Sequence, residues 1–244
     1  MYKFLLTLLL TLPLSLCGQD LVVSSYNIRN GMGMGGERDL DRTASVITGM
    51  GARFVALQEV DSVTMRSGKL DVLSTLAAKC AMQSTYARAI AYDGGAYGIG
   101  LLSRDKPLST RRVALDGREE ARVLLVAEFE DCIVFCTHFS LTADDQTSSI
   151  RRVVELAKEY RKPIIFMGDL NLEPSSPQFD LLREHFILLS SATQPTYPAD
   201  KPTQTIDYIW SSLPSKYNVK YSEVVDAPTE SDHRPIKVCV SVNR

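Results

Sequence analysis

The stretch Lys162–Ser176, KPIIFMGDLNLEPSS, begins as an apolar run and then presents Asp169 and Asn171, one residue apart. The apolar run predicts a buried strand. Because residues i and i+2 of a strand share a face, a strand that continues to its tip would present both polar side chains together. Ligands bind at the edge of such sheets, where the chain leaves the strand. A simple turn is the alternative, since Gly, Asp, Asn and Pro are common turn residues.

The composition is that of a globular protein. The chain has 244 residues, of which 45% are hydrophobic and 23% charged, so a large core is expected. Its formal net charge of −2 gives no overall basic field of the kind that non-specific duplex-binding proteins carry.

The first residues, MYKFLLTLLLTLPLSLCGQD, resemble a secretory leader. A Lys precedes an apolar run that Pro13 interrupts and that ends in small residues. The run is too short and interrupted for a spanning helix, and a buried N-terminal helix is the alternative. We predict a signal peptide over residues 1–19, cleaved near Gly18 and Gln19 or carrying lipid on Cys17. The protein is then exported to the periplasm, the medium or the cell surface, and residues 20–244 form one domain.

Four further cysteines follow the leader: Cys80, Cys132, Cys136 and Cys239. Cys132 and Cys136 lie in CIVFC, about 13 Å apart at the rise of a strand. That separation is too long for a disulfide between them. Export permits disulfides, but these residues read as small apolar strand residues. No Cys/His spacing indicates a zinc site.

Short apolar runs outnumber helical patterns along the chain. Strands are predicted at 21–28, 52–60, 84–92, 97–103, 121–129, 132–139, 162–168, 205–210, 217–225 and 235–242. Helices are predicted at 40–50, 70–79, 144–160 and 177–184. Many strands with few helices favour sheets packed together with helices outside.

Polar residues gather where these strands end. They are Asn27, Gln58, Glu59, His138, Asp169, Asn171, Asp207, Asp232 and His233. Any one of them is ordinary in a loop, but Asp207 lies inside the apolar TIDYIW and must be paired or neutralised. Two of the three histidines stand beside such tips, while His185 reads as a surface residue. Oxygen ligands with imidazoles and no thiolate suit Mg²⁺, Mn²⁺ or Ca²⁺.

Seven segments together resemble a known family. In chain order they are SYNIRNG, VALQEVD, YGIGLLSR, CTHFS, MGDLNLEPSS, TIDYIW and SDHRPI. They are similar to the motifs of the endonuclease/exonuclease/phosphatase superfamily, the DNase I-like metal-dependent phosphoester hydrolases. The resemblance runs from about Leu21 to Val240. It implies an α/β fold, a four-layer α/β/β/α sandwich of two packed mixed sheets with outer helices, and a site at one edge of the sheets.

The resemblance also implies a metal site. Glu59 resembles the principal Mg²⁺ ligand of the family, with Asn27 beside it and Asp232 near the metal. Mg²⁺ is the expected cofactor, with Mn²⁺ or Ca²⁺ as alternatives.

The same resemblance assigns roles around the substrate. Asp169 matches the acid that orients or deprotonates the attacking water, and Asn171 the amide that holds phosphoryl oxygens. His233 resembles the imidazole that contacts phosphate, with Asp207 fixing its orientation. His138 resembles a second imidazole, backed by the carboxylate of Glu120, although the neighbouring Glu119 stays open as the alternative.

The implied activity is hydrolysis of a phosphoester. We expect a phosphodiesterase, nuclease-like or acting on a phospholipid or small phosphoester. A phosphomonoesterase of sugar or inositol phosphates is the alternative, and a non-catalytic phosphate-binding module a remote one. The motif THF favours the DNase, sphingomyelinase, deadenylase and phosphatase branches, and Arg29 replaces an acid found in abasic-site nucleases. A monomer without an obligate protein partner is expected.

Two other patterns point elsewhere. GMGMGG, Gly31–Gly36, has the spacing of a dinucleotide-binding fingerprint, with Glu59 at the end of the next strand. Its first Gly lies four residues beyond Asn27, too late for the tight turn that the fingerprint needs, so a mobile loop beside the site is the better interpretation. A modest basic cluster favours a solvated strand face over a nucleic-acid track. Its members are Arg104, Lys106, Arg111, Arg112 and Arg118.

Overall fold

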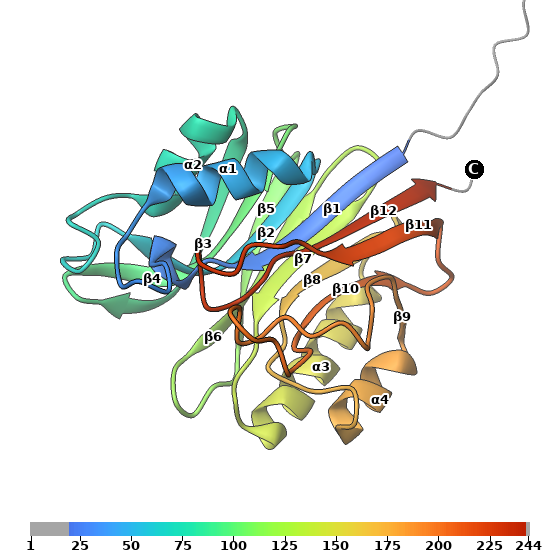
Figure 1. Cartoon of the computed structure of the whole chain (residues 1–244). Helices are drawn as coiled ribbons and strands as arrows, with labels where there is room; N and C mark the ends of the chain where they lie inside the picture. The colour runs from blue at the N-terminus through green and yellow to red at the C-terminus, as the bar shows by residue number, and fades with distance from the viewer. Residues whose placement is uncertain (1–19, 243–244) are drawn as a thin grey trace, which may run out of the picture.

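The computed structural model describes residues 20–242, which form two six-stranded sheets (Figure 1). The predicted leader, residues 1–19 with Cys17, lies outside the described residues. The first sheet consists, in spatial order, of β11 (Tyr217–Val224), β12 (Ile236–Val242), β1 (Asp20–Asn27), β2 (Phe54–Ser62), β4 (Gly95–Ser103) and β3 (Gln83–Tyr92). The second consists of β5 (Ser109–Leu115), β6 (Arg122–Glu128), β7 (Ile133–His138), β8 (Ile164–Asp169), β10 (Asp207–Ser212) and β9 (Phe186–Leu188).

The helices cover the outer faces of the sheets (Figure 1). Apolar residues of α1 (Leu40–Met50) and α2 (Val72–Cys80) pack on β1 and β2 of the first sheet. Those of α3 (Ala143–Ala157) and α4 (Pro177–Arg183) pack on the second sheet. The order of layers is therefore helix, sheet, sheet, helix, as the sequence predicts. Within residues 20–242, none of the helices combines the length and apolarity needed to cross a bilayer.

Successive side chains of β7 and β8 point to opposite faces of their sheet, so these strands contribute to two hydrophobic cores. In β7 and β8, Cys136, Ile165 and Met167 enter the core between the sheets. Their neighbours Phe135 and Phe166 enter the core beneath α3 and α4. Strands that are buried on both faces read as continuous apolar runs, and this is why KPIIFMG stands out in the sequence.

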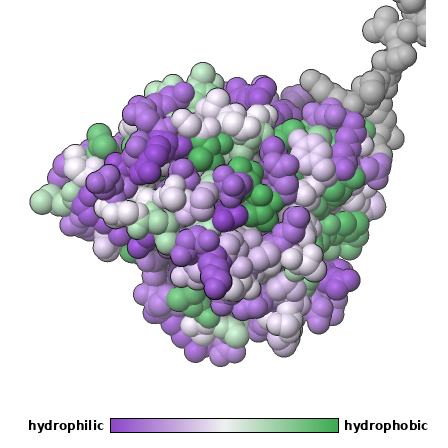
Figure 2. Space-filling view, viewed as in Figure 1, coloured by the Kyte–Doolittle hydropathy of each residue, from purple (hydrophilic) through white to green (hydrophobic). Residues whose placement is uncertain are grey.

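Two strands escape the sequence prediction. β5 carries the exposed polar residues STRR on an edge of its sheet, so its alternation is weak. β9 is only three residues long. Cys80, Cys132, Cys136 and Cys239 are all free. Cys136 and Cys239 lie in β7 and β12, as predicted, whereas Cys80 is the last residue of α2 and Cys132 directly precedes β7. Hydrophilic residues cover much of the face shown in Figure 2, with hydrophobic residues in smaller groups between them.

Gly168 allows β7 and β8 to approach each other beside the polar strand ends. It pairs with Thr137, and a Cβ at this position would overlap the Thr137 carbonyl. We expect Gly168→Ala to lower the free energy of unfolding by about 1–3 kcal/mol, since the strands must separate. Gly49→Ala is the matched control, because Gly49 lies in α1 with open space around it. Urea denaturation measures both variants, and equal stability of the two would contradict the prediction.

Candidate active site

Three polar side chains stand in one row across neighbouring strands. The register pairs His138 of β7 with Asp169 of β8, and Asp169 with Asp207 of β10. Asp169 follows Ile165 and Met167 on the face that enters the core between the sheets. The row therefore lies where that core ends, facing the first sheet.

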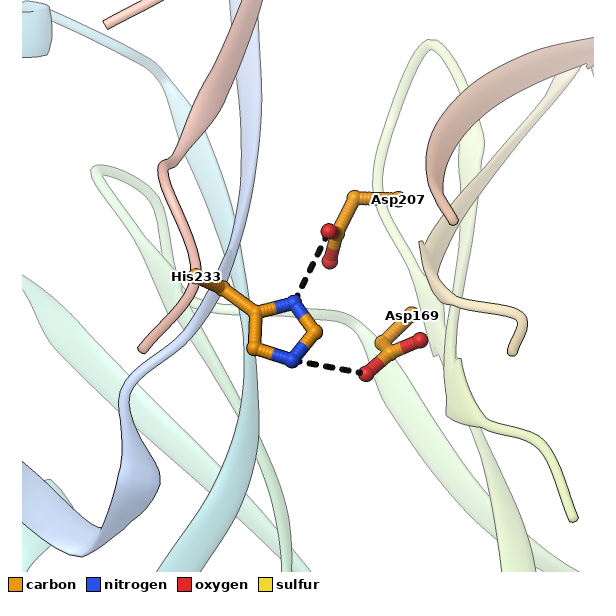
Figure 3. Close-up of side chains that lie close together, drawn as sticks. All are labelled: Asp169, Asp207 and His233. Carbon is orange, nitrogen blue, oxygen red and sulfur yellow. Dashed lines mark hydrogen bonds and ion pairs between the residues drawn. The ribbon is translucent and has the colours of Figure 1, made fainter. Parts of the chain in front are cut away.

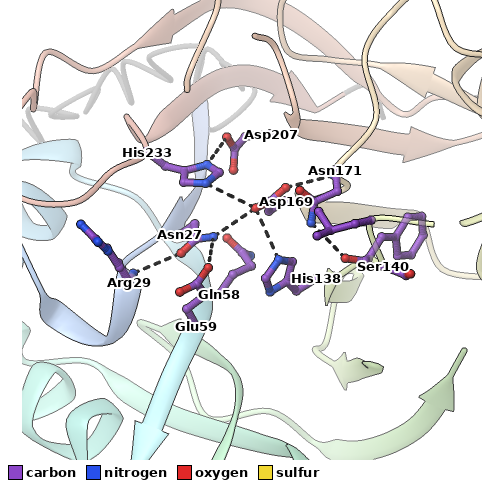
Figure 4. Close-up of polar contacts among 12 residues, drawn as sticks. Asn27, Arg29, Gln58, Glu59, His138, Ser140, Asp169, Asn171, Asp207 and His233 are labelled. Atoms are coloured by element: carbon purple, nitrogen blue, oxygen red, sulfur yellow. Dashed lines mark hydrogen bonds and ion pairs between the residues drawn. The ribbon is translucent and has the colours of Figure 1, made fainter. Parts of the chain in front are cut away.

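Asp169 is the centre of this arrangement (Figure 4). Its Oδ2 accepts a 3.0 Å hydrogen bond from Nδ2 of Asn27, which lies at the end of β1 in the opposite sheet. The same oxygen lies 3.5 Å from His138 Nε2 and 3.7 Å from His233 Nε2. Burial, and then the charge of Asp207, raises the pKa of Asp169 to about 7. Both histidines therefore face one carboxylate oxygen of Asp169.

His233 is held by Asp207 (Figure 3). Nδ1 of the ring lies 3.0 Å from Asp207 Oδ2, which also accepts a 2.6 Å hydrogen bond from Thr196 Oγ1. The ring of Tyr197 packs against the imidazole, with 4.8 Å between ring centroids. Burial lowers the pKa of His233, but Asp207 and Asp169 outweigh it and raise the pKa to about 10. His233 is thus an imidazolium at neutral pH, and the predicted pairing with Asp207 is present.

His138 differs from His233 in charge and in support. Burial, followed by the charges of Arg122 and His233, holds its pKa well below the usual value, so His138 is neutral. The prediction that Glu120 backs this ring is wrong: Glu120 Oε1 lies 3.1 Å from Arg122 Nη1 instead. Glu119, the other candidate, pairs with Arg122 Nη2 and accepts hydrogen bonds from the loop after β7. Within residues 20–242, neither carboxylate contacts the imidazole.

Asn171 reaches the site through a turn rather than along a strand. β8 ends at Asp169, and Asn171 adopts a left-handed backbone with a φ of 50°. Its backbone N–H donates to Asp169 Oδ1 at 3.0 Å, which closes an Asx-turn. Its Nδ2 donates to the Phe139 carbonyl at 3.0 Å. The shared strand face predicted from alternation is therefore wrong, although both residues line the same cavity.

A bulge aims Glu59 into the site. Gln58 takes the inward position and accepts a hydrogen bond from Ser25 Oγ, so regular alternation would point Glu59 outward. The pairing of β2 with β4 shifts between Leu57 and Val60, and Glu59 has a φ of 57°. β-bulges beside active sites commonly redirect a side chain in this way. Glu59 accordingly lines the same cavity as Asp169.

The carboxylates of Glu59 and Asp232 fit a hard cation. Burial raises the pKa of Glu59, and Asp232 raises it further because the two like charges are close. A divalent cation between such oxygens would relieve the repulsion, and Mg²⁺, Mn²⁺ and Ca²⁺ all accept them.

Asn27 lies beside Glu59, within hydrogen-bonding distance. Its Nδ2 donates to Glu59 Oε1 at 3.1 Å, while its Oδ1 accepts from the Arg29 backbone N–H. The Asn27 amide therefore bridges Glu59 and Asp169, and its role beside a metal stays a prediction.

A second group of potential ligands lies nearby. Single ligand atoms of Asp169, Asp207 and His233 all lie within 4.8 Å of one another. Both ring nitrogens of His233, however, face carboxylate oxygens (Figure 3). An imidazolium has no lone pair for a metal. The predicted cation site on Glu59 and Asp232 stays a prediction, and there Asp232 Oδ2 lies 3.5 Å from Arg29 Nε.

Apart from Asn27 and Asp207, the predicted site residues line a cavity of about 500 Å³. The sequence analysis did not identify four polar or aromatic residues that line this cavity: Tyr97, Arg122, Tyr197 and Gln204. Arg122 had a detectable signal, because a charged residue opens the apolar run of β6 two positions after Glu120. The tyrosines and Gln204 carried no signal, since such residues are common in loops and on strand faces.

The two patterns set aside in the sequence remain outside the site chemistry. Asp39 caps α1, where its carboxylate accepts from the N–H groups of Asp41 and Arg42, so no phosphate is needed at that helix end. In the basic cluster, Arg111 pairs with Glu159 and Arg118 with Asp144. These pairs agree with a solvated face.

Comparison with known proteins places this arrangement in a family. Residues 24–233 match the model of the Endonuclease/Exonuclease/phosphatase family. No curated protein matches the chain by sequence. Among solved structures, a member of that family from Bacteroides thetaiotaomicron has a TM-score of 0.75 and 18% identity, covering 93% of this chain and 99% of its own.

Two further structures carry more specific names. The mannosyl-6-phosphatase of Bacteroides thetaiotaomicron has a TM-score of 0.72 and 19% identity, over 89% of this chain and 98% of its own. The catalytic domain of human Nocturnin, with a bound sulfate anion, has a TM-score of 0.67 and 17% identity, over 92% of this chain and 94% of its own. At these identities the structures show a shared fold. With the match of residues 24–233, they establish that the chain belongs to the endonuclease/exonuclease/phosphatase family of phosphoester hydrolases.

Proposed function

We propose that the protein is an exported, divalent-metal-dependent hydrolase of a small phosphoester, in which Asp169 orients and deprotonates the attacking water. The convergence of Asn27, His138 and His233 on one oxygen of Asp169 supports this proposal most directly. A carboxylate fixed by three neighbours at the base of a cavity is suited to positioning a nucleophile.

The two histidines would serve different purposes. In phosphoryl transfer, negative charge is spread over the phosphoryl oxygens, and catalysis consists mainly of positioning and electrostatic stabilisation. The charged His233 donates to those oxygens, and Asp207 fixes its ring. The neutral His138 would hold the Asp169 carboxylate from another side, where its Nε2 lies 3.5 Å from Oδ2. Asn171 uses one N–H on Phe139, and its second N–H is left for a phosphoryl oxygen.

Glu59 and Asp232 would hold the divalent cation. A bound cation supplies charge neutralisation on the phosphoryl oxygens. We propose Mg²⁺ or Mn²⁺, with Ca²⁺ as an alternative, because the donor oxygens suit all three.

The substrate is either a phosphodiester or a phosphomonoester. The phosphodiester expected from the sequence stays a prediction. The likeness in fold to a mannosyl-6-phosphatase favours a monoester as the second candidate. Export rests on the leader pattern of residues 1–19, and it is tested by the N-terminus and the cell fraction of the mature protein.

Metal removal tests the proposal as a whole. We expect hydrolysis of p-nitrophenyl phosphate or bis-p-nitrophenyl phosphate to stop in EDTA and to return with excess Mg²⁺ or Mn²⁺. Binding of phosphate without turnover of either ester, with metal present, would show a phosphate-binding module instead.

The pH dependence follows from Asp169. Its pKa is raised to about 7, and only the carboxylate form can take a proton from water. We therefore expect kcat/KM to fall as the pH drops below about 7, or at a lower pH where a bound cation favours the charged carboxylate. Initial rates at saturating metal between pH 5 and 9 measure this limb. Activity that increases towards pH 5 would remove Asp169 from the role of base.

A further inference from the structure

One wall of the active-site cavity is polar and has no part in the proposed chemistry. Tyr97, Glu120 and Arg122, called here the polar wall, line the cavity together with Glu59. Arg122 is 7% exposed and lies 3.1 Å from both Glu119 and Glu120. The wall is therefore fixed in place by a buried guanidinium.

The two glutamates beside Arg122 are not equivalent. Glu119 uses both oxygens internally, accepting from the Leu141 N–H at 2.7 Å and the Ser140 hydroxyl at 2.8 Å. It ties the start of β6 to the loop before α3. Glu120 meets Arg122 through Oε1 alone, and among residues 20–242 its other oxygen has no partner. Its side chain is 27% exposed, so this oxygen is available to a ligand in the cavity.

Tyr97 supplies a second unused polar group. Its side chain lines the cavity and the residue is 8% exposed, yet its hydroxyl has no hydrogen-bond partner within the described part of the chain. The ring is fixed from behind, with Tyr92 at 6.1 Å between centroids and the Arg66 guanidinium 5.4 Å from its centre. A phenol can both donate and accept a hydrogen bond, so this hydroxyl can bind a hydroxyl group of a ligand in the cavity.

The charge of the cavity limits what the ligand carries. Its lining holds five carboxylates, Glu59, Glu119, Glu120, Asp169 and Asp232, against Arg122 and the charged His233. One phosphate can be neutralised by a divalent cation and His233, but a second phosphate near Glu120 would be repelled. Uncharged hydroxyl groups, in contrast, donate well to a free carboxylate oxygen.

We infer that the alcohol part of the phosphoester substrate is uncharged and rich in hydroxyl groups, as in a monosaccharide, and that Glu120 and Tyr97 bind those hydroxyls. The inference rests on the proposed hydrolytic function and adds the substrate class. It makes Glu120 and Tyr97 specificity residues that contact the alcohol rather than the phosphate.

The test is a ratio of kcat/KM values for two monoesters, a hexose 6-phosphate and hexyl phosphate, which lacks free hydroxyls. We expect the wild type to prefer the hexose phosphate. Glu120→Gln and Tyr97→Phe should each lower that preference, by about 10- to 100-fold for the glutamate, the value of a hydrogen bond to a charged group. Glu130→Ala is the control, because Glu130 is exposed and outside the cavity lining.

Further arms separate the alternatives. A dinucleotide tests a nuclease, and phosphatidylinositol vesicles test a lipid head group as the source of hydroxyls. Better turnover of either than of hexose phosphate would overturn the inference, as would an unchanged preference in both variants. Failure to hydrolyse any ester, p-nitrophenyl phosphate included, would instead count against the proposed function itself. Melting temperatures of the variants confirm that each is folded.

Discussion

Asp169→Asn is expected to lower kcat by at least about 10²-fold, the low end for a positioned general base, with little change in KM. The substitution keeps the shape and the acceptor oxygen but removes the charge that draws a proton from water. Asn27 Nδ2 and the Asn171 N–H each donate to Asp169, so one of these two bonds can survive in the variant. Steady-state kinetics at saturating metal, with circular dichroism for folding, measures the effect.

Asn171 provides the companion measurement. Its left-handed backbone disfavours Ala, so Asn171→Gly removes the amide with less strain. If the amide binds charge that grows in the transition state, kcat should fall by a factor comparable with that of Asp169→Asn. The double variant should lose less than the product of the single losses, because both residues act on one step. Single variants that raise KM alone would show that the pair merely holds substrate. Wild-type activity in Asp169→Asn would show that the end of β8 forms a simple turn without a catalytic role.

The sequence predicts much of this site because the strands impose simple rules. Apolar runs locate most strands, and the polar residues at their ends fall into one place because the strand ends meet there. The row of His138, Asp169 and Asp207 follows from the pairing register. The acid inside TIDYIW needed a partner, and His233 supplies it at 3.0 Å.

The sequence could not predict the features that arise where the local backbone departs from those rules. Glu59 points inward only because of the bulge in β2, which no local pattern in VALQEVD indicates. Asn171 reaches the cavity through a left-handed turn after the strand has ended. The sequence could not show whether the Glu120 carboxylate lies nearer to Arg122 or to His138, because this depends on how the side chains pack in the fold. Glu120 pairs with Arg122 because a buried guanidinium needs carboxylate partners.

Glu59→Gln should abolish hydrolysis, by at least about 10³-fold in kcat/KM, since a bound cation stabilises the transition state by several kcal/mol. Gln keeps an oxygen that can accept from Asn27, and its neutrality removes the repulsion from Asp232 that raises the pKa of Glu59. The metal-free variant should therefore melt at nearly the temperature of the metal-free wild type. Loss of the fold without metal would make Glu59 structural instead.

Metal binding then locates the cation independently of activity. Added Mn²⁺ should raise the melting temperature of the wild type, because a ligand of the folded state stabilises it, and should raise that of Glu59→Gln much less. Asp207→Asn is the discriminating control. The alternative group of Asp169, Asp207 and His233 predicts that this variant loses the Mn²⁺ effect, while a cation on Glu59 and Asp232 predicts that it keeps it. An imidazolium between two carboxylates already offsets one of their two charges and occupies both facing oxygens, so we expect the Mn²⁺ effect to persist in Asp207→Asn and to be lost in Glu59→Gln.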